Sequence, residues 1–194
     1  MLRTGTAFYI AQHSDWECAG SAENLDSALR DFERLAGANA IPLLVISDLN
    51  FSGENTGFSY IEKLRALYPG IKIIVYSMFF AAGMVQSAIQ SGASGYVSKN
   101  ANTADLLLCM EKALDGELFV QEELQENLTK YQKLTDALTK REKQVMELLL
   151  RRLSNEQIAD ALGIKKRAVD NYVSSIYEKT RVNDRERLIK KYGL

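Results

Sequence analysis

The 194-residue sequence predicts two domains, an α/β domain built on a buried parallel sheet and an all-α domain that follows it. Three observations support this division. Continuous apolar runs alternate with helical patterns between about residues 6 and 117, which is typical of a parallel sheet covered by helices. The last sixty residues instead contain several helix-start signals in succession. The charge is also divided unevenly, since residues 1–134 carry a net charge of −6 and residues 135–194 a net charge of +5.

Length and composition fit an ordinary globular protein with room for two small domains, because 46% of the residues are hydrophobic and 25% are charged. Cys18 and Cys109 have no CxxC or metal-binding spacing, so both thiols are expected to be buried in the fold. Such cysteine usage is typical of a protein in a reducing compartment. A single histidine, His13, excludes most histidine-based metal sites. We find no signal peptide and no apolar stretch long enough to span a bilayer, so a cytoplasmic protein is expected.

Short apolar runs predict the strands of the sheet, and helical patterns lie between them. The predicted strands are Ile41–Ser47, Ile71–Ser77 and Ser94–Ser98, and the predicted helices are Ser59–Tyr68, about Ala81–Ser91 and Ala104–Asp115. A further strand is expected near the N-terminus, at Phe8–Ala11.

Polar side chains stand at the ends of three predicted strands: Asp48, Ser77 and Lys99. The carboxyl ends of parallel strands gather functional groups at one edge of the sheet. A carboxylate nucleophile with a hydroxyl and an ammonium beside it could bind and position a phosphoryl group. The pattern alone is equally compatible with the alternative that these three are ordinary strand-end residues without a function.

This region resembles the receiver domain of bacterial response regulators over about 70 residues. The matching residues are Asp48-Leu49-Asn50, Gly57, Ser77 and the run Gly92-Ala93-x-Gly95-Tyr96-Val97-x-Lys99. The resemblance implies a flavodoxin-like sheet in which Asp48 is the phosphoacceptor, Ser77 the switch hydroxyl, Tyr96 the switch aromatic residue and Lys99 the partner lysine.

The magnesium site that receivers use is where the sequence departs from the family. Receivers hold the ion with an acidic pair at the end of the first strand, and the corresponding positions here are Ala11 and Gln12. Only Asp48 and the Asn50 backbone then remain as ligands, so we expect neither magnesium nor any other cofactor to bind. Phe51-Ser52 also replaces the usual Met-Pro after the phosphoacceptor turn.

The segment before Asp48 is about nine residues shorter than the family pattern, so the domain is shortened at its N-terminus. One alternative, which we favour, loses the first helix and makes Trp16–Ala19 a short second strand before a helix at Leu25–Leu35. In the other, Leu25–Leu35 is the first helix and the second strand is absent. The sequence does not decide between them.

The C-terminal segment contains the signals of a helix-turn-helix. Thr139 with Glu142 and Ser154 with Gln157 form capping boxes, which mark the starts of two helices. Gly163 supplies the left-handed position that ends the second of these helices. The next helix places Val169, Val173 and Ile176 on one face, which is predicted to be core. A short helix, a turn with glycine and a longer helix is the helix-turn-helix order.

Residues 135–194 closely resemble the LuxR-type DNA-binding domain, through Leu138–Glu142, Ser154–Ile164 and Val169–Lys179. A receiver (residues 1–118) followed by such a domain is the architecture of NarL/FixJ-type response regulators. Residues 119–134 are predicted to be a helical linker, with Leu124, Leu128, Tyr131 and Leu134 at helical spacing. This linker is either a solvated spacer or a helix that docks on the receiver or pairs between subunits.

The resemblance also implies which side chains meet double-stranded DNA. Lys165, Lys166 and Arg167 would contact phosphates or, in one case, a guanine edge, and Lys179 would reach the backbone. Asp170, Asn171 and Ser174 occupy the base-facing positions. Asp170 departs from the Lys or Arg of many relatives, and we expect its carboxylate to accept from a cytosine amino group or to pair with Arg167 or Ser174.

The predicted function is a DNA-binding transcription regulator of the response-regulator type, not an enzyme, which acts as a homodimer without conventional phosphorylation. The helix at Asp184–Tyr192 resembles the one by which relatives dimerise, although Leu188 and Ile189 could equally belong to the core. One alternative is a regulator switched by a sensor kinase through Asp48. Another is a protein-interaction regulator with weak DNA binding. No membrane partner is expected.

Overall fold

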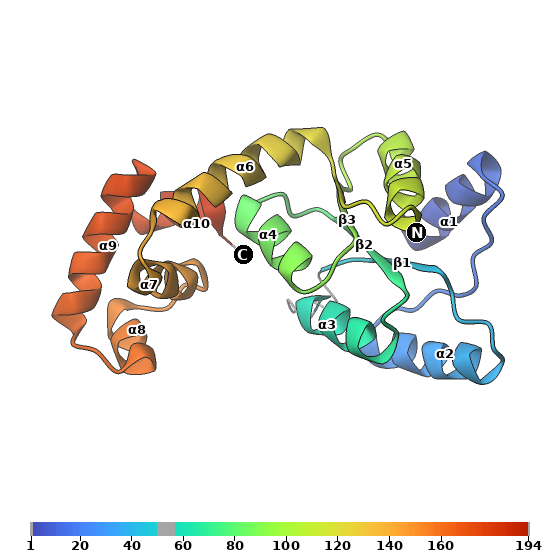
Figure 1. Cartoon of the computed structure of the whole chain (residues 1–194), viewed down its shortest axis with the longest axis horizontal. Helices are drawn as coiled ribbons and strands as arrows, with labels where there is room; N and C mark the ends of the chain where they lie inside the picture. The colour runs from blue at the N-terminus through green and yellow to red at the C-terminus, as the bar shows by residue number, and fades with distance from the viewer. Residues whose placement is uncertain (1, 50–56, 194) are drawn as a thin grey trace. The chain divides into compact units, whose positions relative to one another are not determined.

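The computed structural model describes residues 2–49 and 57–193 (Figure 1). The chain divides into two compact units. The first contains Met1–Phe79 and Ser87–Gln121, and the second contains Phe80–Gln86 and Glu122–Leu194. In the described residues, no helix is both long and apolar enough to cross a membrane.

The first unit is built on a parallel sheet in the order β1-β2-β3-β4. Its strands are β1 (Leu44–Ser47), β2 (Lys72–Ser77), β3 (Gly95–Ser98) and β4 (Phe119–Val120). The first three confirm the predicted strands and the predicted fold class. The fourth was missed, because Phe119 and Val120 were assigned to the start of the helical linker.

Helices cover both faces of this sheet (Figure 1). They are α3 (Gly57–Leu67), α4 (Ala82–Gln90) and α5 (Thr103–Leu114), each within two residues of its predicted bounds. On one face, Cys109 and Leu106 of α5 pack with Val97 and other side chains of the sheet. This burial raises the pKa of the Cys109 thiol to about 12. The prediction that both cysteines are buried is wrong for Cys18, which is exposed.

The N-terminal prediction is wrong in its strands. The chain begins with α1 (Leu2–His13), and α2 (Leu25–Gly37) follows it, so Phe8–Ala11 is helical. Trp16–Ala19 is neither helix nor strand. Both alternatives required a strand before α2, and neither is therefore correct, although the helix they shared is present.

Local contacts show why α1 is a helix. The rings of Tyr9 and His13, one turn apart, stack with centroids 4.1 Å apart, and the Ser14 hydroxyl donates to the Ile10 carbonyl. Ile10 and Trp16 pack against the same hydrophobic cluster as α5. A short apolar run fits a strand and a half-buried helix equally well, and here tertiary packing favours the helix.

Besides the first part of α4, the second unit contains the helices α6 (Glu122–Ala137), α7 (Lys140–Leu150), α8 (Asn155–Leu162), α9 (Lys166–Thr180) and α10 (Arg185–Tyr192). Both predicted capping boxes are formed, at the starts of α7 and α8. Gly163 ends α8 with φ 62°, the left-handed conformation that glycine adopts without strain. This turn sets the direction in which α9 leaves α8.

The hydrophobic core of the second unit lies between α7, α8, α9 and α10. Val169, Val173 and Ile176 are buried in it, as predicted from their spacing. Leu188 and Ile189 of α10 belong to the same core.

The linker helix is not a fully solvated spacer. Tyr131 and Leu134 of α6 pack against the core of the second unit, and the rings of Tyr131 and Tyr192 lie 5.7 Å apart. The segment therefore packs on its own helical unit, a contact that was not among the predicted alternatives.

Candidate functional site

The three strand-end residues of the first unit meet at the carboxyl edge of the sheet. The Lys99 ammonium donates to Asp48 Oδ2 at 2.5 Å, and the Ser77 hydroxyl donates to Asp48 Oδ1 at 3.0 Å. The Leu49 amide also donates to Asp48 Oδ1, at 2.7 Å. The sequence therefore located this cluster correctly, and the structure shows Asp48 as the acceptor at its centre.

Tyr96 and Gly57 are fixed in the positions that the receiver pattern implies. Tyr96 is fully buried, its hydroxyl donates to the Phe79 carbonyl at 2.8 Å, and burial raises its pKa. A Cβ atom on Gly57 would lie 2.5 Å from Leu49 Cα, so only glycine allows this close approach of the two backbones. Asn50 and the Phe51-Ser52 pair lie outside the described residues.

Sequence reasoning missed Gln121 beside this cluster. Its side chain is buried, its Oε1 accepts from the Ser98 backbone amide at 3.0 Å, and its backbone N–H donates to the Tyr96 carbonyl at 3.1 Å. Gln121 thus anchors the end of β4 next to the strand that carries Lys99. A lone glutamine after a two-residue strand has no pattern that could have indicated this contact.

The described residues do not fit a magnesium ion. Ala11 and Gln12 are exposed on a helix and stand at no strand end. The two oxygens of Asp48 already accept from an ammonium, a hydroxyl and an amide. Within the described ranges, no group of three His, Cys, Asp or Glu side chains is placed to hold a metal. Magnesium requires several hard oxygen ligands, which the described residues at this edge of the sheet do not supply.

The start of α9 presents the predicted basic side chains. Lys165, Lys166 and Arg167 are all exposed. Lys166 forms an ion pair with Glu156 of α8 at 2.7 Å, and this hydrogen bond raises its pKa. In the part of the chain that the structure describes, no ion pair engages Lys165 or Arg167, so these two cations are available to an anionic partner.

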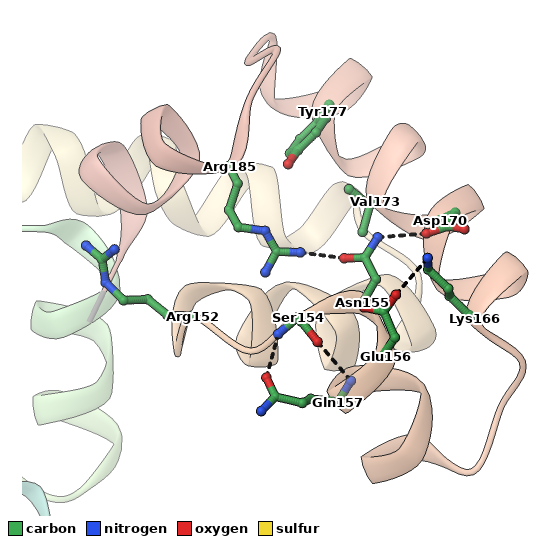
Figure 2. Close-up of a pocket in the computed structure, with 10 residues that line it drawn as sticks. All are labelled: Arg152, Ser154, Asn155, Glu156, Gln157, Lys166, Asp170, Val173, Tyr177 and Arg185. Carbon is green, nitrogen blue, oxygen red and sulfur yellow. Dashed lines mark hydrogen bonds and ion pairs between the residues drawn. The ribbon is translucent and has the colours of Figure 1, made fainter.

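The predicted base-facing residues lie along the next turns of α9. Asn171 and Ser174 are exposed, and Asp170 is half-buried. Asp170 Oδ1 accepts from the Asn155 side-chain amide at 2.7 Å, so the carboxylate pairs with α8 and not with Arg167 or Ser174 as expected (Figure 2). The Ser174 hydroxyl donates to the Asp170 backbone carbonyl.

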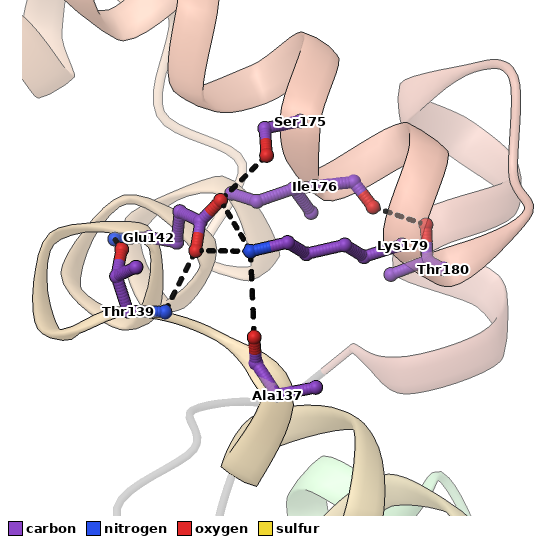
Figure 3. A network of polar contacts seen from close by, with 7 residues as sticks. All are labelled: Ala137, Thr139, Glu142, Ser175, Ile176, Lys179 and Thr180. Carbon is purple, nitrogen blue, oxygen red and sulfur yellow. Dashed lines mark hydrogen bonds and ion pairs between the residues drawn. The ribbon is translucent and has the colours of Figure 1, made fainter.

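Lys179, predicted to reach the DNA backbone, is engaged inside the domain (Figure 3). Its ammonium lies 2.7 Å from Glu142 Oε2 and 2.8 Å from Oε1, and it donates to the Ala137 carbonyl. Ser175 and the Thr139 amide also donate to the Glu142 carboxylate. The network ties α9 to the start of α7, and a contact of Lys179 with DNA stays a prediction.

The pKa of Glu142 depends on this network, because its side chain is only 5% exposed. Burial by itself would raise its pKa, but the hydrogen bonds from Lys179, Ser175 and Thr139 outweigh it and lower the pKa to about 2. Glu142 is therefore charged in the folded domain at neutral pH.

Glu156 is expected to compete with DNA for Lys166. Replacing Glu156 with Gln removes the ion pair and one negative charge beside the basic helix start, so affinity for duplex DNA should rise by a factor of about two to four. Fluorescence anisotropy at several salt concentrations measures this change. Glu178→Gln, which removes an exposed charge elsewhere on α9, is the control. Equal affinities for Glu156→Gln and the parent chain would show that Lys166 stays away from DNA.

A parallel-sheet domain with a strand-end Asp-Ser-Lys cluster, joined to a helix-turn-helix domain, defines a class of receiver-linked regulators. Residues 1–111 match the family model described as response regulator receiver domain, and residues 136–191 match bacterial regulatory proteins, luxR family. The chain belongs to the response regulators and is of the NarL/FixJ type. It is a DNA-binding transcription regulator.

Individual relatives agree with this membership. The nitrate/nitrite response regulator NarL of Escherichia coli K12 is 30% identical over 193 residues, which cover 95% of this chain and 87% of NarL. DesR of Bacillus subtilis is 35% identical over 144 residues, which cover 74% of this chain and 69% of DesR. RcsB from Salmonella enterica serovar Typhimurium, solved on promoter DNA, shares the fold with a TM-score of 0.71 at 19% identity, over 98% of this chain and 91% of RcsB.

Proposed function

We propose that this regulator binds double-stranded DNA as a homodimer through α9, and that its receiver domain works without phosphoryl transfer to Asp48. In this proposal residues 1–118 are an atypical receiver, residues 119–134 connect the domains, and residues 135–194 bind DNA. The observation that carries the DNA-binding proposal is the exposed, basic start of α9. The proposal on the receiver rests on the exposed, helical positions of Ala11 and Gln12, where receivers carry an acidic pair. Because the proposed partner is chromosomal DNA, we expect the protein to act in the cytoplasm.

DNA binding through α9 follows from charge and geometry. The helix-turn-helix places its second helix in the major groove, where the first turn meets phosphates and base edges. Lys165 and Arg167 stand exposed at that first turn, and Asn171 and Ser174 are exposed along the following turns. Asn171 can donate to and accept from adenine, and Ser174 is permissive.

Support for a dimer comes from a relative and from α10. RcsB has been solved as two dimers bound to two parallel DNAs. In this chain the apolar side chains of α10 are buried in its own domain, and its outer face carries Glu186, Arg187, Lys190 and Lys191. A contact through this face would be polar, so we expect the dimer to form mainly on DNA.

The residues available as magnesium ligands near Asp48 favour a receiver that works without phosphorylation. Phosphoryl transfer in such sites depends on a metal ion that neutralises the developing charge. Ser77 and Lys99 bind Asp48, and the described side chains at the strand ends include no acidic pair to hold that ion. The intact Asp48, Ser77 and Lys99 cluster and the match to the receiver family favour the alternative of a switch driven by a sensor kinase. A third possibility, a protein partner on the receiver, is compatible with DNA binding.

Acetyl phosphate in the presence of magnesium tests the phosphorylation state. We expect no stoichiometric mass gain of about 80 Da by intact-mass spectrometry, and DNA binding of Asp48→Asn within about twofold of the parent chain. Asp115→Asn, at an exposed position at the end of α5, is the matched control. A full gain of one phosphoryl group that disappears in Asp48→Asn would restore the kinase-driven alternative and refute this part of the proposal.

A further inference from the structure

Asp170 is an unusual residue on a DNA-binding helix, because it carries a negative charge toward a negatively charged partner. It lies among the exposed residues of α9 and is only half-buried. Its Oδ1 is held by the Asn155 amide at 2.7 Å. No contact of Oδ2 is found among the described side chains other than the nearby charge of Lys166. One carboxylate oxygen is therefore fixed, and the other is left to meet a donor.

Arg185 of α10 fixes the orientation of Asn155. Its guanidinium donates both to Asn155 Oδ1 and to the Leu153 carbonyl. An amide whose oxygen faces a guanidinium must direct its NH₂ group the other way, here toward Asp170 (Figure 2). The three side chains form a relay, Arg185 to Asn155 to Asp170, which connects α10 and α8 to the DNA-facing helix.

A fixed carboxylate discriminates among bases because it only accepts hydrogen bonds. In the major groove, guanine N7 and O6 and thymine O4 are acceptors and would repel it. Adenine offers an amino donor, but its N7 acceptor lies alongside. The cytosine N4 donor has an acceptor, guanine O6, on one side only, whereas the adenine amino group lies between N7 and thymine O4, so a single carboxylate oxygen suits cytosine best. Fixing the side chain before binding also reduces the entropy lost on contact.

We propose that Asn155 and Arg185 are positioning residues that hold Asp170 as a selector for cytosine at one position of the target site. This inference rests on the proposed function, since it requires α9 to enter the major groove. It explains how a carboxylate is tolerated at a position where a cation would bind DNA more strongly. The carboxylate lowers the affinity for all DNA sequences but increases the selectivity for one base pair.

Selection of binding sites from a random duplex library with the full chain tests the proposal. The parent chain should enrich cytosine at one position of each half-site. Asp170→Asn should lose that preference by about tenfold while the other positions are unchanged. Asn155→Ala should weaken the same preference through loss of positioning. Ser174→Ala, on the same face of α9, is the control and should leave the cytosine position intact.

A double substitution separates positioning of the carboxylate from a merely structural role. Asn155→Asp together with Asp170→Asn reverses the hydrogen bond between the two positions and keeps an acceptor for Arg185. This variant should melt near the parent temperature yet fail to enrich cytosine. Cytosine enrichment by the double variant, or identical preferences for Asp170→Asn and the parent chain, would overturn the inference. Absence of any enrichment by the parent chain would refute the proposed DNA contact by α9, and this inference with it.

Discussion

Replacing Lys179 with Met is expected to destabilise the helix-turn-helix domain by about 3 kcal/mol, because it leaves the Glu142 carboxylate charged and without its cation in a buried position. Met keeps most of the length and apolar surface of the lysine stem, so packing changes little. The ammonium contacts both oxygens of Glu142, whose side chain is only 5% exposed. A loss of this size should lower the melting temperature by more than about 10 °C.

The stabilisation by this pair should depend on pH in a defined direction. The pKa of Glu142 falls from 4.5 to about 2 in the folded domain. A carboxyl with a lowered folded-state pKa stabilises the fold fully above about pH 5, and this stabilisation is lost as the pH falls toward 2. The difference in melting temperature between the parent chain and Lys179→Met should thus be largest near neutral pH and should narrow steadily in acid.

Two signals assign the effect to the correct domain. Trp16 is the single tryptophan of the chain and lies in the first unit, so its fluorescence monitors that unit. Far-UV circular dichroism also detects the helices of the second unit. Lys190→Met removes an equal charge from an exposed site of α10 and should cost less than about 0.5 kcal/mol. Equal melting curves for the two variants would show that the Glu142 network does not stabilise the domain.

The helix-turn-helix domain could be predicted because its signals are local. Each capping box spans four residues, and Gly163 marks its turn by its own conformational freedom. The Asp48 cluster could be predicted for a different reason. Parallel strands deliver their carboxyl ends to one edge, so the strand assignments alone bring Asp48, Ser77 and Lys99 together.

Elements without a local signal could not be predicted. The apolar run around Phe8 to Ala11 suits a strand as well as a helix. The contacts of the helix found in the structure, among them Ile10 packed against the α5 cluster, have no counterpart in the sequence pattern. The strand Phe119–Val120 has two residues, too few for any periodicity.

The polar networks of the second unit could not be predicted from the sequence either. Lys179 and Glu142 are 37 residues apart, Arg185 and Asn155 are 30 apart, and Asn155 and Asp170 are 15 apart. Such pairs have no spacing rule, because they depend on how helices cross. This explains why the alternatives considered for Asp170, a cytosine amino group or a neighbour on its own helix, did not include Asn155 of α8.

Replacing Lys165 and Arg167 together with Ala should lower affinity for DNA by about 10²- to 10³-fold near physiological salt. Three basic residues from each subunit of a dimer would give a log–log salt slope near −5, since each phosphate contact releases about 0.9 counterion. The double variant removes four contacts per dimer, so its slope should flatten to about −2. The loss should be nearly equal on every sequence, because phosphate contacts carry no base information.

The ion pair of Lys166 makes a further difference within the basic cluster. Lys166 must leave Glu156 to reach a phosphate, whereas no such ion pair holds Lys165 or Arg167. Lys166→Ala should therefore cost about tenfold or less, well below the effect of the double variant. Lys140→Ala with Lys143→Ala removes the same charge from exposed positions of α7 and serves as the control. Anisotropy titrations over a series of salt concentrations measure all four chains, and a double variant with an unchanged slope would show that α9 does not lie on the phosphates.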